Sequence, residues 1–154
     1  MFKITKDFIK NHKFESDGLN FPDDEEIYFR PRKGMKLPPN AAENFTTLKI
    51  KLLELFEKHY EKNFAKLDAN CAIHEDIMRK YLKGTRKITR EAVAKFCVGT
   101  KLTVEESAEL FTLQGHSLET ETQLFDAIVV DALQCGDDMN IFFDTCQEYK
   151  LDIF

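Results

Sequence analysis

Residues 64–110, FAKLDANCAIHEDIMRKYLKGTRKITREAVAKFCVGTKLTVEESAEL, contain the pattern that decides the fold. Apolar residues recur there at spacings of three and four with charged residues between them, which is the periodicity of amphipathic α-helices. Polar N-caps and glycine stops divide the stretch into short helical segments. The predicted boundaries are a stop at Gly84, an N-cap at Thr89, a stop at Gly99, a capping box of Thr103 with Glu106, and a stop at Gly115.

Helical periodicity continues on both sides of this stretch. Before it, a helix of about four turns is expected from Asn44 to about Tyr60, with apolar residues again at spacings of three and four. After it, two more helices are expected, one ending at Gly136 and the other opening on Asp137 or Asp138. A series of short helices joined by short turns predicts an all-α orthogonal bundle.

The start of the chain has a different composition, because all four prolines lie within residues 1–40. Proline lacks an amide donor and disfavours helix in the residue before it, so this segment is expected to be mostly irregular. Two short elements are predicted within it, a helix in the first ten residues and a strand at residues 26–31.

Three regions are therefore expected in one principal domain. They are an N-terminal extension (1–43), the helical bundle (44–116) and an acidic helical C-terminal extension (117–154).

Composition indicates a soluble protein, with 43% hydrophobic and 32% charged residues. We find no apolar run long enough for a transmembrane helix and no secretory signal, so we expect no membrane association and a cytoplasmic location. The four cysteines form no C-x-x-C pair, and we expect reduced, structural thiols and no metal site. No calcium loop is present and no cofactor is expected.

Charge is distributed unevenly along the chain. Residues 63–100 carry eight Lys or Arg against four Asp or Glu, whereas residues 101–154 carry two against twelve. From Arg79 to Arg90 there are six basic residues and no acidic one. Such a cluster suits phosphate binding, and the alternative is a solvated surface that pairs with the acidic end of the same chain.

The run from Phe64 to Leu110 resembles the helix-turn-helix of lambda-repressor-like proteins, the Cro/XRE group. The residues that carry the resemblance are Phe64, Ala65 and Leu67, then Cys71 and Ile73, then Ile77, Tyr81, Leu82, Gly84 and Arg86, and finally Ala92, Val93, Phe96 and Leu102. The resemblance implies a lambda-repressor-like bundle, with residues 73–84 as the recognition segment and two extra helices at the C-terminus.

A helix-turn-helix places its second helix in the major groove, where side chains of the first turns contact base edges and neighbouring cations contact phosphates. The expected base contacts are His74, Glu75, Asp76 and Arg79. The expected phosphate contacts are Lys80, Lys83, Arg86, Lys87 and Arg90. An N-terminal arm of Arg30, Arg32, Lys33 and Lys36 is also expected to contact DNA.

The start of this helix, His74-Glu75-Asp76, argues against DNA binding. The helix dipole stabilises two carboxylates at the helix N-terminus. The same carboxylates face the DNA polyanion where the protein approaches it most closely. A glutamate can accept from cytosine N4, so the carboxylates are compatible with base contacts.

The C-terminal region, 110–149, is similar to the extension of some Firmicute helix-turn-helix proteins. Asp126, Ala127, Ile128, Val129, Ala132 and Leu133 carry this likeness. Its many phenylalanines are expected either to pack onto the bundle or to form a homodimer interface through the C-terminal helices.

We find no hydrolase, metalloprotease or phosphate-loop motif and expect no enzymatic activity. The first hypothesis is a DNA-binding protein that regulates transcription, with double-stranded DNA as its partner. The alternative is a protein-interaction module of phage or mobile-element type, in which the acidic C-terminal region binds a basic, nucleic-acid-binding partner.

Overall fold

The computed structural model describes residues 3–15 and 41–151. Every regular element in these residues is a helix, which confirms the all-α class for the described part of the chain. The predicted strand at residues 26–31 lies outside it. The helices are α1 (Lys6–Asn11), α3 (Ala41–Tyr60), α4 (Phe64–Cys71), α5 (Glu75–Lys83), α6 (Arg90–Thr100), α7 (Val104–Gln114), α8 (Leu124–Cys135) and α9 (Met139–Glu148).

The N-caps, the capping box and the glycine stops in the sequence predict most helix ends correctly. The Thr89 hydroxyl accepts from the Ala92 N–H, as an N-cap does. Thr103 and Glu106 exchange both bonds of a capping box, each at 3.1 Å. The other confirmed boundaries are the stops at Gly84, Gly115 and Gly136 and the N-cap Asp138.

The predicted stop at Gly99 is wrong. α6 runs through this residue to Thr100 and ends where Lys101 adopts a left-handed conformation with φ 61°. A Cβ on Gly99 would lie 2.3 Å from the carbonyl oxygen of Asn70 and 2.6 Å from the Cys71 sulfur. The glycine therefore allows α4 and α6 to approach each other closely.

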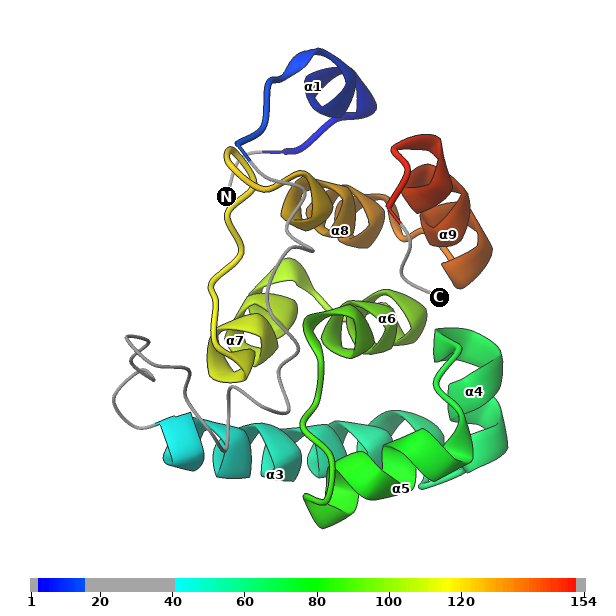
Figure 1. Cartoon of the computed structure of the whole chain (residues 1–154). Helices are drawn as coiled ribbons and strands as arrows, with labels where there is room; N and C mark the ends of the chain where they lie inside the picture. The colour runs from blue at the N-terminus through cyan, green and yellow to red at the C-terminus, as the bar shows by residue number, and fades with distance from the viewer. Residues whose placement is uncertain (1–2, 16–40, 152–154) are drawn as a thin grey trace.

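The helices α4 and α5 both pack on α3. α3 begins at Ala41, three residues before the predicted start. Leu48, Leu52, Phe56 and Tyr60 form its buried stripe at a spacing of four residues. In Figure 1, α3 and α5 lie at one end of the molecule and α1 lies at the other.

α8 lies at the centre of the upper half of the bundle in Figure 1 and contacts α1, α6, α7 and α9. Its eight residues from Phe125 to Ala132 are all buried, which explains why the segment is apolar on every side. The C-terminal helices thus complete the core rather than extend from it.

The apolar surface of the C-terminal region is mostly used within the chain. Phe111, Phe125 and Phe142 are fully buried, whereas Ile141 remains 45% exposed. These three phenylalanines therefore pack within the chain, which is the first of the two roles expected for them.

The start of the chain packs on α8. The Ile4 N–H donates to Gln134 Oε1 at 2.8 Å, and the Lys6 ammonium lies 2.7 Å from the buried Asp131 carboxylate. Ile4 and Ile9 are buried beside them, so the predicted short helix is part of the core.

Candidate nucleic-acid interface

The connection between α4 and α5 consists of Ala72, Ile73 and His74. Ala72 adopts a left-handed conformation, φ 55° and ψ 38°, which ends α4 and turns the chain toward α5. Ile73 is buried, and Lys95 of α6 donates to the Ala72 carbonyl oxygen at 3.2 Å. The turn is therefore held in place by the buried Ile73 side chain and by the hydrogen bond from Lys95.

One face of α5 is buried and the other is exposed. Met78 and Tyr81 point into the core, where Leu67 and Cys71 of α4 are also buried. The exposed residues at and after the start of α5 are His74, Glu75, Asp76, Arg79, Lys80 and Lys83. These include all four predicted base contacts and two of the predicted phosphate contacts.

His74 caps the start of α5. Its Nδ1 accepts from the Asp76 N–H at 3.1 Å, so in this arrangement the ring hydrogen is on Nε2. The cap places His74, Glu75 and Asp76 together at the exposed N-terminus of the helix, where a helix in the major groove contacts bases.

Arg79 lies one turn further along the same face. Its Nε donates to Glu75 Oε2 at 3.0 Å, and its guanidinium lies 4.5 Å from the centre of the Phe64 ring. Both members of the ion pair are about half exposed. The pair offsets the Glu75 charge on a surface that is expected to meet phosphates.

The predicted contact at Arg90 is wrong, because its side chain is inside the protein. It is 5% exposed, donates to both carboxylate oxygens of Asp126 and donates to the His116 carbonyl oxygen at 2.9 Å. A buried, paired guanidinium has no access to a phosphate. The sequence signal for this pairing was Asp126 itself, one of two acids in a helix that is mostly apolar.

Arg86 and Lys87 follow α5 in the loop before α6 and are partly buried. The Lys87 ammonium lies 4.6 Å from the centre of the Phe45 ring. Lys49 of α3 joins these two residues around a hollow of about 170 Å³. Sequence reasoning missed Lys49, because this residue is far from the loop along the chain and no local pattern connects the two. The predicted arm, Arg30, Arg32, Lys33 and Lys36, lies outside the described residues.

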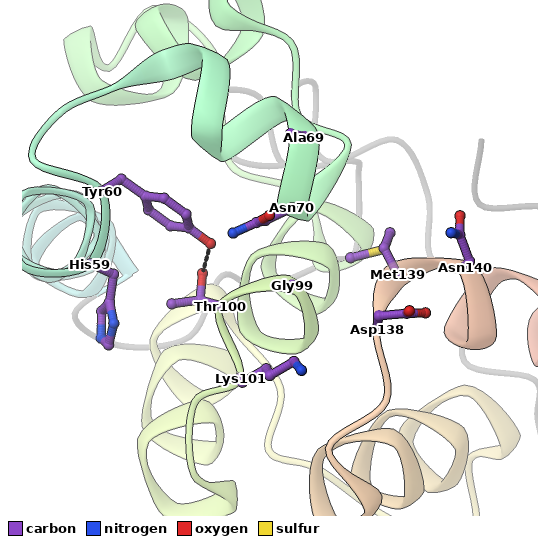
Figure 2. Close-up of a pocket in the computed structure, with 10 residues that line it drawn as sticks. All are labelled: His59, Tyr60, Ala69, Asn70, Gly99, Thr100, Lys101, Asp138, Met139 and Asn140. Atoms are coloured by element: carbon purple, nitrogen blue, oxygen red, sulfur yellow. Dashed lines mark hydrogen bonds between the residues drawn. The ribbon is translucent and has the colours of Figure 1, made fainter.

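A different hollow, of about 470 Å³, lies between α4, the end of α6 and the start of α9. Figure 2 shows Tyr60, Asn70 and Thr100 on one wall and Asp138, Met139 and Asn140 on the other. The Tyr60 hydroxyl lies 2.8 Å from the Thr100 hydroxyl oxygen. Burial raises the pKa of Tyr60 to about 12, so the phenol stays protonated and is not a general base near neutral pH.

The buried thiols are likewise unsuited to nucleophilic chemistry. Burial raises the pKa of Cys97 and of Cys146 to about 12, so both remain thiols at neutral pH. Among residues 3–15 and 41–151 there is no group of three side chains suited to a metal ion. None of the helices in these ranges is long and apolar enough to cross a membrane.

A comparison of the chain with protein-family models, with curated proteins and with solved structures found no match in any of the three. The relationship to the lambda-repressor-like family therefore stays a prediction from the residues quoted above.

Proposed function

We propose that the protein binds double-stranded DNA and regulates transcription, with α4 and α5 acting as a lambda-repressor-like helix-turn-helix. The observation that carries the proposal is the exposed face of α5. Its six residues include every predicted base contact, while Met78 and Tyr81 hold the opposite face in the core. A rigid helix with one free polar face is the element that fits the major groove.

The charge of this face supports DNA as the partner. Arg79, Lys80 and Lys83 follow the two carboxylates along α5, so the positive charge lies on the part of the helix beyond its first turn. Arg79 partly offsets the charge of the Glu75 carboxylate, so DNA must tolerate what remains of that charge together with the charge of Asp76. Cations at the rim of a groove-binding helix are suited to contact the phosphates beside the groove.

The alternative, an interaction module whose acidic region binds a basic partner, has less support. Of the twelve acids in residues 101–154, Asp126 and Asp131 are buried in ion pairs, and Glu106 and Asp138 cap helices. A further one, Glu109, is paired with Lys51 of α3 at 2.7 Å. Much of the acidic surplus thus has a role inside the fold.

A salt titration tests the proposal. Fluorescence anisotropy with random and genomic duplexes should show binding that weakens as salt rises from about 50 to 200 mM, because cations that contact phosphates release counterions. No duplex binding even at low ionic strength would reject DNA binding. Stable capture of a basic protein by a chain that binds no duplex would support the alternative.

A further inference from the structure

The Glu75–Arg79 pair on α5 restricts which atoms of Arg79 a ligand can meet. The guanidinium has five N–H donors on three nitrogens. The Nε donor is used by Glu75 Oε2 at 3.0 Å, and the guanidinium carbon lies over the Phe64 ring, 4.5 Å from its centre. In the described part of the chain, no hydrogen bond or ion pair involves either Nη atom. The group is therefore held by Glu75 at Nε and by the Phe64 ring, and its Nη end is presented to solvent.

We infer that Arg79, held by Glu75 and Phe64, recognises a guanine through its two Nη atoms, and that Glu75 is its positioning residue. This inference rests on the proposed DNA binding by α5. Guanine presents two acceptors, O6 and N7, at its major-groove edge, and the parallel N–H bonds of a guanidinium fork match them.

Glu75 has two opposed effects in this arrangement. It limits the rotamers of Arg79, so less conformational freedom is lost when the guanine contact forms. It also places a negative charge beside the phosphates, which weakens binding to every duplex alike. Removing the carboxylate is therefore expected to strengthen binding to all duplexes and to reduce the preference for guanine.

Asp76 provides a matched control on the next residue. It is exposed, it is also in the first turn of α5, and in the described part of the chain its carboxylate makes no contact with Arg79. Asp76→Ala removes the same charge as Glu75→Ala and leaves the Arg79 pair in place. Gln at position 75 keeps an oxygen that can accept from Nε and lacks the charge.

The experiment is selection of duplexes from a random library, followed by anisotropy with the selected site and with the same site carrying adenine in place of the guanine. The wild-type chain is expected to select one guanine and to prefer it about tenfold or more, within the range of one bidentate contact. Glu75→Ala should lose most of that preference, whereas Glu75→Gln and Asp76→Ala should keep it. Arg79→Lys should lose it too, since lysine has no fork.

A second measurement examines the pair without DNA. In nitrogen-edited NMR spectra of the free protein, the Arg79 Nε–H should exchange slowly with water in the wild type and rapidly in Glu75→Ala. Circular dichroism establishes that each variant is folded before its preference is compared.

The outcomes separate this inference from the proposal on which it depends. Salt-dependent duplex binding without a guanine preference, or an equal loss of preference in Glu75→Ala and Asp76→Ala, would overturn the role of Arg79 and Glu75 and leave DNA binding intact. Failure to bind any duplex would overturn both.

Discussion

The Arg90 guanidinium donates to both carboxylate oxygens of Asp126, at 2.8 and 2.7 Å, and both side chains are buried. The two residues are 36 positions apart and join α6 to α8. Arg90 also donates to the His116 carbonyl oxygen, and Asp126 accepts from the Glu119 N–H at 2.8 Å. The pair therefore holds the connection between α7 and α8 as well as the two helices.

Breaking this pair on one side is expected to destabilise the protein severely. Arg90→Ala or Asp126→Asn should lower the free energy of unfolding by about 3–5 kcal/mol, because an unpaired buried charge or polar group remains. Urea denaturation measures the loss. The comparison is Glu109→Ala, which breaks the exposed pair with Lys51 and should have a much smaller effect. Equal losses in the two variants would contradict the structural role of the Arg90 pair.

Gly99 gives a second stability prediction. In a helix interior, Gly→Ala normally stabilises by about 1 kcal/mol through helix propensity. Here the new Cβ would lie 2.3 Å from the Asn70 carbonyl oxygen, so α4 must move away from α6. Gly99→Ala should therefore destabilise by about 1–3 kcal/mol in thermal or urea denaturation, as overpacking does. A stabilised variant would show that the two helices do not approach this closely.

The boundaries that the sequence predicted correctly depend on short-range bonds. Thr89, the Thr103 and Glu106 box, and Gly84 interact with backbone atoms a few residues away, so local composition determines them. The exposed face of α5 was predictable for a related reason, since a period of 3.6 residues assigns each side chain to a face.

The two corrected residues depend on partners distant in sequence. Gly99 has the composition of a helix stop, and only the position of Asn70 on a neighbouring helix gives it another role. Arg90 belongs to a basic cluster in the sequence, yet the acid that pairs with it lies on α8. Packing between helices determines both, and no pattern within a single helix contains that information.

The capping box at the start of α7 predicts a pH dependence. The Thr103 backbone N–H donates to Glu106 Oε1 and holds the pKa of the Glu106 carboxyl below its usual value of 4.5. A lowered pKa in the folded state means that the carboxylate contributes stability above about pH 4.5, and that this contribution is lost as pH falls through the folded-state pKa. The side-chain amide of a glutamine at this position does not titrate, so it would not lose its contribution to stability in this way.

Glu106→Gln keeps an oxygen that accepts from Thr103 and should therefore show a smaller loss of melting temperature than the wild type between pH 6 and pH 3, roughly the range over which carboxylates titrate. Glu106→Ala removes the acceptor and should cost about 1 kcal/mol at neutral pH, as lost caps do. Thermal denaturation followed by circular dichroism at each pH makes the comparison. Identical pH profiles for the wild type and Glu106→Gln would count against the box.

Lys83 tests the proposed phosphate contacts on α5. Lys83→Ala should weaken binding to random and specific duplexes by the same factor and reduce the salt slope by about one unit, because a phosphate contact carries no sequence information. Lys10→Ala is the matched control: it removes a cation that is also exposed, from α1 at the end of the molecule opposite α5 in Figure 1. Anisotropy over a salt series measures both variants.

If long-range attraction by net charge alone held the DNA, the two substitutions would weaken binding equally, since each changes the total charge by one. A larger effect at Lys83 assigns the contact to the face of α5, and an effect confined to one selected sequence would instead make Lys83 a base contact.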